Sequence, residues 1–418
     1  MRLRSQWWGA AFAALLSVFA TVSALASDEI TIQGVPLPTD ASEATGGSPF
    51  ASAFVGLWDG MRKTILVLEE VGEDGTAKVL YGISPFGDQQ PGGWLRYTGT
   101  IDGTTLTVTG KHATSTFTLT PNGRLKGVFS DGYGFAILRP VSLAALLDDP
   151  EGTRFGTGEP VMLDTALVDD GKPVALEAVI FSPAGDGPFP LAVVNHGSTG
   201  YGNDQSLFGL TWTNPWLAET LIERGYLVAF PQRRGRGRSE GLYDEGFTED
   251  RRHYTCEPAR SLKGADRALG DIEAAITALR GRADVADGPA LLSGQSRGGV
   301  LSVAYAGLHP EDVSGVVNFV GGWMGDGCPE ASTINQTLLN KGAAFGKPML
   351  WFYGHDDLYY SIEHNRQNLA AFRDAGGTAA FEEVRVRGEN NGHYVIAIPP
   401  LWDTPLAQYL NEIGAPTQ

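Results

Sequence analysis

The chain has 418 residues, of which 42% are hydrophobic and 19% charged, and this composition is typical of a globular protein with two or three domains. Its formal net charge is −17, with 31 Lys and Arg residues against 48 Asp and Glu residues. A nucleic-acid-binding surface needs clustered Lys and Arg, so this balance predicts that nucleic acid is not a partner.

The N-terminus has the pattern of a secretory signal peptide over residues 1–26. Arg2 and Arg4 precede an apolar stretch at 7–20, and residues 24–26 (A-L-A) match a cleavage site. An uncleaved membrane anchor is the alternative, because the apolar stretch is nearly long enough to span a bilayer. We therefore expect an exported protein, periplasmic or secreted, with no membrane span after cleavage.

The next part of the chain predicts an all-β domain over residues 51–141. Residues 27–50 before it are rich in Ser, Thr, Pro and Gly and are expected to form a flexible lead-in. Short alternating runs separated by Asp-Gly and Asn-Gly turns then indicate an antiparallel meander, closed as a barrel or folded as a sandwich. The predicted strands cover residues 64–70, 77–83, 94–101, 104–109, 115–119 and 135–138.

A different rhythm begins after an acidic stretch at 142–158, which we expect to be a linker. Residues 159–418 predict a hairpin followed by strands that alternate with helices, which gives a mostly parallel sheet covered on both faces. The predicted strands cover residues 162–168, 176–181, 191–195, 227–230, 290–293, 313–320, 349–353 and 381–386. Asn214 and Ser361 have the sequence context of helix N-caps.

The most informative motif is G-Q-S-R-G at residues 294–298, directly after a predicted strand. A G-x-S-x-G sequence between a strand and a helix is typical of a nucleophile elbow, in which a sharp turn exposes the serine hydroxyl above the sheet. Ser296 is therefore the predicted nucleophile. It needs a neighbouring base, because a serine hydroxyl is a weak nucleophile at its ordinary pKa.

The base and its orienting acid are expected after later strands, in the order serine, acid, histidine. Asp357 follows the predicted strand at 349–353 and is the favoured acid, with Asp356 as the neighbouring candidate. His393 lies in a loop beyond the next predicted strand and is the predicted base. The set Ser296, Asp357 and His393 would form a catalytic triad.

An oxyanion hole requires backbone N–H groups from the residue after the nucleophile and from a loop after an early strand. Arg297 is the first predicted donor, and Ser198, in H-G-S-T-G after the strand at 191–195, is the second, with Thr199 as the alternate. Large side chains near strand ends are candidates for the substrate pocket: Phe208, Trp212, Trp323, Met324 and Tyr359. Each of them could instead belong to the core.

Two further features concern Arg and Cys. Residues 232–241 hold four arginines among glycines, which indicates either an anion site or, as we favour, a bent connection braced by arginine hydrogen bonds. Cys256 and Cys328 are the two cysteines, and an exported protein would join them in one disulfide; two separate buried thiols are the alternative.

Together these motifs resemble the α/β-hydrolase superfamily from about residue 160 to the C-terminus. The elements in family order are H-G, then G-Y-L-V-A-F-P with R-G-R-G-R-S-E-G, then G-Q-S-R-G-G, then G-H-D-D, and a late G-H. The likeness is strongest to the dienelactone-hydrolase-like and acyl-peptidase-like branches. Dienelactone hydrolases use a cysteine nucleophile, whereas this chain has Ser296. The N-terminal β domain is too short for a seven-bladed propeller.

The resemblance implies a serine hydrolase that acts on a small-molecule ester, without a cofactor. A serine peptidase or amidase acting on short peptides is the alternative, with Glu240 and Asp244 as candidate binders of an amino terminus. A non-catalytic binding protein on a hydrolase scaffold would not need the complete Ser296, Asp357 and His393 set. No H-x-x-H or comparable cluster predicts a metal site.

Overall fold

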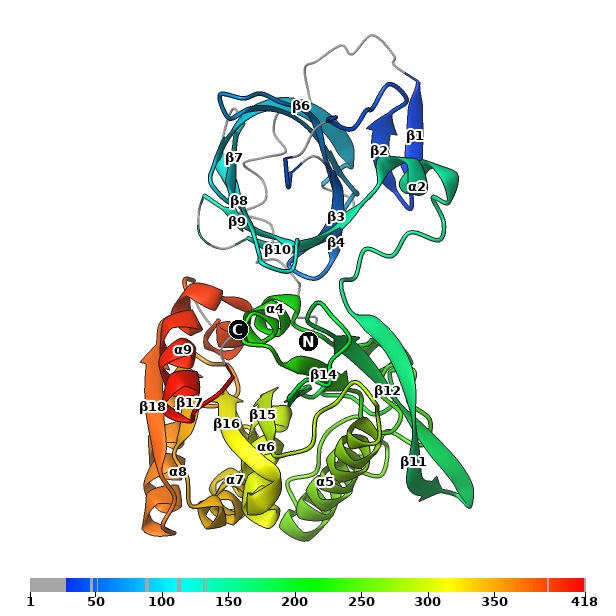
Figure 1. Ribbon diagram of the computed structural model, residues 1–418. Coiled ribbons are helices and arrows are strands. Elements are labelled where there is room, and N and C mark those ends of the chain that lie inside the picture. Colours follow the sequence, from blue (N-terminus) through cyan, green and yellow to red (C-terminus); the bar gives the residue numbers. More distant parts are fainter. Residues whose placement is uncertain are drawn as a thin grey trace. The chain divides into compact units, whose positions relative to one another are not determined.

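The computed structural model describes residues 28–416 except 46–47, 51, 87–89, 111–113, 131, 133 and 389–390, so the predicted signal peptide lies outside the described residues. The chain divides into two compact units, Met1–Thr157 and Gly158–Gln418 (Figure 1). Among the described residues, no helix is both long and apolar enough to cross a membrane.

The first unit contains a closed antiparallel barrel of eight strands, so of the two predicted arrangements the barrel is the one found (Figure 1). The strands are β3 (Ala53–Trp58), β4 (Arg62–Val71), β5 (Thr76–Ile83), β6 (Gly93–Asp102), β7 (Thr105–Thr109), β8 (Thr114–Leu119), β9 (Leu125–Phe129) and β10 (Phe135–Val141). Each pairs with its neighbour in sequence, and β10 closes the barrel against β3.

The barrel is filled by apolar side chains that alternate along its strands. Phe54 and Trp58 of β3 belong to the inner core, and the Trp58 ring contacts Phe117 and Phe129 at centroid distances of 6.0 and 6.1 Å. Because β8 and β9 are not neighbours of β3 in the sheet, these contacts cross the barrel interior. Aromatic pairs in this edge-to-face geometry add to the stability gained by burial.

The expectation of a flexible lead-in over residues 27–50 is wrong where this segment is described. Strands β1 (Glu29–Ile32) and β2 (Val35–Pro38) form a hairpin whose Ile32, Val35 and Leu37 are fully buried. They pack with outward-facing residues of β3 and β4 and with helix α2 (Leu143–Asp148). The segment 142–158 is also folded, since Leu143, Leu146 and Phe155 join this second core. Burial of these apolar side chains is the physical reason for the order.

The second unit is built on an eight-stranded mixed sheet in the order β11-β12-β14-β13-β15-β16-β17-β18. The strands are β11 (Glu159–Asp169), β12 (Lys172–Phe181), β13 (Leu191–Asn195), β14 (Leu227–Pro231), β15 (Ala290–Gln295), β16 (Val313–Phe319), β17 (Met349–Gly354) and β18 (Ala379–Val384). The β11–β12 hairpin and the β12–β14 pair are antiparallel, and the other pairs are parallel. The predicted hairpin and mostly parallel sheet are confirmed.

Helices cover both faces of this sheet, with α4 and α9 on one face and α5, α6, α7 and α8 on the other (Figure 1). The helices are α3 (Gln205–Phe208), α4 (Pro215–Ile222), α5 (Pro258–Arg280), α6 (Arg297–Leu308), α7 (Ala331–Lys341), α8 (Ile362–Asp374) and α9 (Asp403–Glu412), with short 3-10 turns η1 (Pro310–Asp312), η2 (Gly342–Phe345), η3 (Gly392–Ala397) and η4 (Pro399–Leu401). Asn214 and Ser361 cap α4 and α8 with their side chains.

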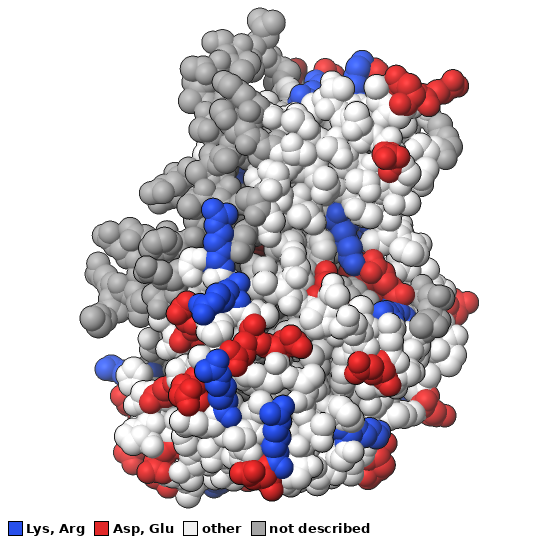
Figure 2. Space-filling model, turned by 90° about the vertical axis from the view of Figure 1, so that its left-hand side faces the viewer, with Lys and Arg blue, Asp and Glu red and all other residues white. Residues whose placement is uncertain are grey.

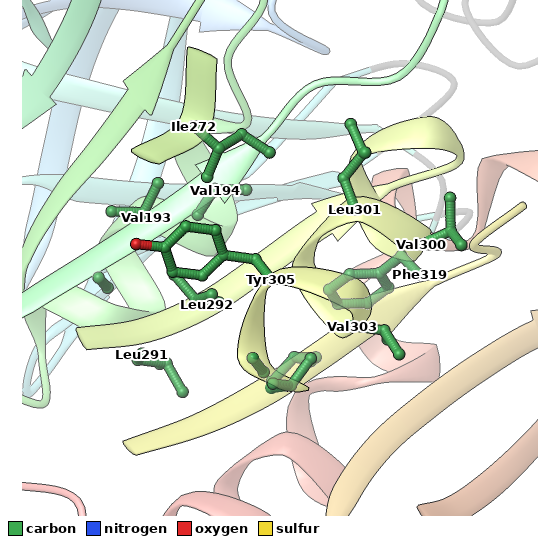
Figure 3. Packing of buried hydrophobic residues seen from close by; sticks show 14 of the residues in the cluster. Val193, Val194, Ile272, Leu291, Leu292, Val300, Leu301, Val303, Tyr305 and Phe319 are labelled. Carbon is green, nitrogen blue, oxygen red and sulfur yellow. The ribbon is translucent and has the colours of Figure 1, made fainter. Parts of the chain in front are cut away.

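The core of the second unit lies where α5 and α6 pack against β13, β15 and β16 (Figure 3). Ile272 of α5 lies next to Val194, and the Tyr305 ring of α6 lies beside Val193 and Leu292 in this layer. Charged side chains of both signs are interspersed on the face shown in Figure 2, rather than gathered into one basic surface. The parallel strands of this sheet all end at the same edge. The predicted site residues lie at this edge, where they follow β13, β15 and β17.

Candidate active site

Ser296 occupies a sharp turn between β15 and α6. Its backbone has φ 54° and ψ −121°, a conformation that residues with a Cβ rarely adopt and that carries strain on the order of 1–3 kcal/mol. The Ser296 N–H donates to the Phe319 carbonyl at 2.9 Å, which ties the turn to the end of β16. The residue is 6% exposed. This is the local geometry of a nucleophile elbow.

The two glycines of the motif are required by close backbone contacts. A Cβ on Gly294 would overlap the Gly298 backbone, and a Cβ on Gly298 would overlap the carbonyl of Asn195. Any larger residue would push the elbow away from β13 or open its turn. The G-x-S-x-G spacing is therefore a packing requirement of the strand–turn–helix junction.

His393 and Asp357 form a hydrogen-bonded pair. His393 lies in η3, and its Nδ1 is 2.8 Å from Oδ2 of Asp357, whose side chain is fully buried. The other carboxylate oxygen accepts the N–H of Tyr359 at 2.7 Å and that of Tyr360 at 3.3 Å. The imidazole contact is made by Asp357, whereas Asp356 has φ 58° and uses its carbonyl to accept the Gly392 N–H.

Ser296 and His393 lie on neighbouring segments but are not directly joined. The side chain of Gln295, next to the elbow, donates to the His393 carbonyl at 3.2 Å. Within the part of the chain that the structure describes, no hydrogen bond links Ser296 Oγ to the imidazole. Catalytic hydrogen bonds are often long in unliganded enzymes and shorten in the substrate complex.

Tyr360 is a site residue that the sequence analysis missed. Its hydroxyl donates to the Gly322 carbonyl at 2.7 Å, and its ring centroid is 5.6 Å from that of His393. Burial raises the pKa of Tyr360 above its ordinary value, and the nearby Ser296 side chain opposes this rise only in part. Tyr360 thus lies beside both the serine and the histidine. A tyrosine three residues after an aspartate carries no recognisable sequence signal.

The loop after β13 passes directly beside the elbow, as expected for an oxyanion loop. A Cβ on Gly197 would lie 3.2 Å from Ser296 Cβ and 3.8 Å from Ser296 Oγ. Ser198 follows at an exposed position. Arg297 is the first residue of α6, where backbone N–H groups lack partners within the helix and favour negative charge.

The predicted pocket residues lie in different environments. Tyr359 is 52% exposed, and its ring centroid is 4.7 Å from that of His393. Trp323 and Met324 are buried around Arg297, and Trp212 packs on Phe230 at 5.7 Å. These contacts place Tyr359 at the histidine.

Phe208 is half-buried, and its ring centroid lies 5.5 Å from that of Tyr243. This contact describes how Phe208 packs within the protein and gives no information on a substrate. Binding of substrate by Phe208, Trp212, Trp323 and Met324 stays a prediction.

The arginines of residues 232–241 are used as braces. Arg233 pairs with Glu245 at 2.6 Å, Arg234 with Asp271 at 2.5 Å, and Arg238 with Glu177 at 2.8 Å. Glu245 and Asp271 are 3% exposed, and Glu177 is 1% exposed. The sequence could not identify these acids, because no local pattern links each arginine to its acid, which lies 12 to 61 residues away along the chain.

The structure contains the predicted disulfide between Cys256 and Cys328, whose Cα atoms are 5.7 Å apart. Glu240 and Asp244, the candidate binders of an amino terminus, are engaged with backbone groups: Glu240 accepts the Ala175 N–H and Asp244 accepts the Gly246 N–H. No group of three or more His, Cys, Asp or Glu side chains in the described residues is placed to hold a metal ion.

Comparison with known proteins adds a family match over residues 211–327, to the family described as serine aminopeptidase, S33. No curated protein matches the chain. Among solved structures, it is similar to Est1E from Butyrivibrio proteoclasticus with bound ferulic acid, at 15% identity, covering 61% of this chain and 99% of that chain with a TM-score of 0.42. It is also similar to the esterase Pf2001 from Pyrococcus furiosus, at 14% identity, 61% and 90% coverage and a TM-score of 0.42. The family match contains the whole Ser296 elbow.

Proposed function

We propose that this chain, a serine hydrolase of the α/β-hydrolase superfamily, is an exported carboxylic-ester hydrolase that works through an acyl-Ser296 intermediate. The hydrogen bond between His393 Nδ1 and Asp357 carries the proposal. It places the ring proton on Nδ1 and leaves Nε2 free to accept a proton from Ser296. A buried carboxylate in this position also stabilises the imidazolium that forms during the reaction.

The reaction then follows from the roles of these groups. Ser296 Oγ attacks the ester carbonyl while His393 takes its proton, and His393 returns that proton to the leaving alcohol. The N–H groups of Ser198 and Arg297 would bind the oxyanion of the tetrahedral intermediate. Water, activated by His393 in the same way, would then hydrolyse the acyl-serine.

The alternative is a serine peptidase acting on short peptides, and the description of the matched family favours it. An aminopeptidase must bind a charged amino terminus, and carboxylates beside the elbow would suit this purpose. Glu240 and Asp244 each accept one backbone N–H through a single carboxylate oxygen. A carboxylate can accept several hydrogen bonds, so the choice between ester and peptide is a matter for experiment.

One experiment separates these proposals. A fluorophosphonate probe should label the wild-type protein and not Ser296→Ala, and equal labelling of both would reject Ser296 as the nucleophile. Turnover of p-nitrophenyl esters should exceed that of aminoacyl-p-nitroanilides by several orders of magnitude. Preference for an anilide would instead identify a peptidase.

N-terminal sequencing of the protein recovered outside the cytoplasm should begin at Ser27 if residues 1–26 are removed on export.

A further inference from the structure

The guanidinium of Arg297 is buried between two aromatic rings at the start of α6. Its Cζ lies 3.3 Å from the Tyr254 ring centroid and 3.9 Å from that of Trp323. Its Nε donates to the Trp323 carbonyl at 3.0 Å, and its Nη1 donates to the Glu245 carbonyl at 2.9 Å and to Glu245 Oε2 at 3.4 Å. Cation–π and ionic contacts therefore fix the residue that follows the nucleophile.

Glu245 connects Arg297 to a second buried arginine. Its Oε1 accepts the Nε–H of Arg233 at 2.6 Å, and its Oε2 accepts from Arg297 and from the Tyr243 hydroxyl. Burial by itself would raise the pKa of Glu245, but the guanidinium groups of Arg233 and Arg297 outweigh burial and lower it. The ionised carboxylate thus bridges two cations.

Arg233 in turn holds the loop after β13. Its Nη1 donates to the His196 carbonyl at 2.8 Å and its Nη2 to the Gly197 carbonyl at 3.3 Å, while Arg236 donates to the Gly197 carbonyl at 3.2 Å. The Arg233 N–H donates to His196 Nε2 at 3.0 Å, so the ring proton is on Nδ1, which lies 2.7 Å from the Gly197 carbonyl. Burial and the two arginines lower the pKa of His196 and keep the ring neutral.

These contacts determine the direction of the Ser198 N–H. The peptide between Gly197 and Ser198 is planar, and in a trans peptide the carbonyl and the N–H point to opposite sides. Three donors hold the Gly197 carbonyl toward the arginines, so the Ser198 N–H is directed away from them. A rotation of this peptide would remove one donor from the predicted oxyanion hole.

We propose that Glu245 is a positioning residue that joins the two arms of the oxyanion hole, through Arg233 to the Gly197–Ser198 peptide and through Arg297 to the elbow. This role rests on the proposed function, because an oxyanion hole matters only for acyl transfer. Glu245 lies in the segment between β14 and α5 and touches neither the Ser296 nor the His393 side chain. Its effect would be confined to transition-state stabilisation, since the N–H groups of Ser198 and Arg297 bind the ground-state ester less strongly than the oxyanion.

The disulfide lies next to this network. Cys256 follows Tyr254 by two residues, and Cys328 comes after Trp323, so the bridge joins the two segments that supply the rings around Arg297. The Cys328 Sγ also contacts the Cys256 carbonyl. The aromatic clamp around Arg297 is therefore covalently closed.

The chain offers a matched control for Glu245. Asp271 is equally buried and pairs with Arg234, the residue next to Arg233, but neither Asp271 nor Arg234 contacts the elbow or the Gly197 carbonyl. Replacing Glu245 by Gln and Asp271 by Asn removes one buried charge in each case. Assays at pH 8 keep both wild-type carboxylates ionised, because burial raises the pKa of Asp271 to about 6.

The test compares kcat, KM and the affinity for a trifluoromethyl ketone, which forms an oxyanion in the site, on the full chain. Glu245→Gln should lower kcat about 10- to 100-fold, less than the roughly 10²–10³-fold loss for removing an oxyanion donor outright, and should leave KM within about two-fold. Ketone affinity should fall in parallel with kcat. Asp271→Asn should leave kcat and ketone affinity within about two-fold of wild type.

A second variant covers the case in which Glu245→Gln does not fold. Arg233→Lys keeps the charge beside Glu245 but loses the fork that reaches the two carbonyls, and it should give the same selective loss of kcat. Unchanged kcat in either folded variant, or equal losses in the Glu245 and Asp271 variants, would overturn the positioning role alone. Absence of any Ser296-dependent turnover in the wild type would overturn the proposed function together with it.

Discussion

The two units of the chain differ in what they bury. The barrel interior is apolar, and in its described residues Arg62 is the charged residue that is buried, donating to the carbonyls of Ser84 and Pro91. The second unit instead buries several charged residues close to the elbow, including Arg233, Arg297 and Glu245. Both units have continuous hydrophobic cores, so the difference does not reflect a shortage of apolar residues.

This difference separates stability from function. Buried ion pairs are weak contributors to stability, because the desolvation of two charges offsets most of their attraction. Their concentration around Ser296 is therefore better explained by the need to hold backbone groups in fixed directions. The comparison predicts that replacing a buried charged residue near Ser296 lowers kcat, whereas replacing a buried apolar residue of the barrel lowers the stability of the barrel.

The largest effect is expected at the histidine's acid. Asp357→Asn should lower kcat by about 10⁴, because the amide stabilises the wrong imidazole tautomer. Steady-state kinetics on a p-nitrophenyl ester measure it. Asp356→Asn is the matched control and should have a far smaller effect, since its side chain makes no contact with His393. A larger loss in the Asp356 variant would transfer the role to that residue.

The next largest effect concerns stability. Replacing Cys256 and Cys328 together by Ser should lower the free energy of unfolding by about 4 kcal/mol, because the bridge spans 72 residues and restricts the unfolded chain. Urea denaturation of the oxidised wild type, the reduced wild type and the double variant measures this change. The reduced wild type and the variant should unfold at the same urea concentration, and an unchanged midpoint in both would refute the disulfide's contribution.

A smaller effect is expected at Tyr360. Tyr360→Phe should lower kcat about ten-fold, since it removes the phenol hydroxyl that lies beside Ser296 and that anchors this ring next to His393 by donating to the Gly322 carbonyl. Tyr353→Phe is the control, because the Tyr353 hydroxyl likewise donates to a glycine carbonyl, that of Gly321 at 2.8 Å. The control should lose stability without a comparable loss of kcat. Equal effects of the two variants on kcat would reduce Tyr360 to a packing role.

The sequence predicts the elements that local patterns specify. The six later strands of the second unit follow from apolar runs, and the caps at Asn214 and Ser361 follow from side-chain chemistry. Strand β3 escapes prediction because both of its faces are buried, Phe54 inside the barrel and Val55 beneath the β1–β2 hairpin, so polar residues do not alternate.

Strand β9 escapes for a different reason, because it contains Gly127, whose Cβ would lie 2.9 Å from the Phe117 ring. A glycine weakens a strand pattern even where packing requires it. In the site, Ser296 carries a local motif, whereas Glu245 and Tyr360 acquire their positions only from tertiary contacts with Arg233 and Gly322. No sequence spacing encodes those contacts.

The smallest effect on turnover is expected from removing the barrel. A chain shortened to residues 158–418 contains every residue proposed for the triad and the oxyanion hole, and it keeps its own hydrophobic core. Its kcat on p-nitrophenyl acetate should therefore stay within about three-fold of the full chain, as expected for a unit that folds independently.

A substitution inside the barrel makes the same comparison in the full chain. Trp58→Ala removes the ring that contacts Phe117 and Phe129, and it should destabilise the barrel by about 3–5 kcal/mol. Far-UV circular dichroism during urea unfolding should then show the barrel unfolding earlier while esterase activity persists to higher urea. A shortened chain that is folded by circular dichroism but inactive would mean that the barrel completes the active site. The buried charges around Ser296 would then be insufficient to hold the oxyanion hole by themselves.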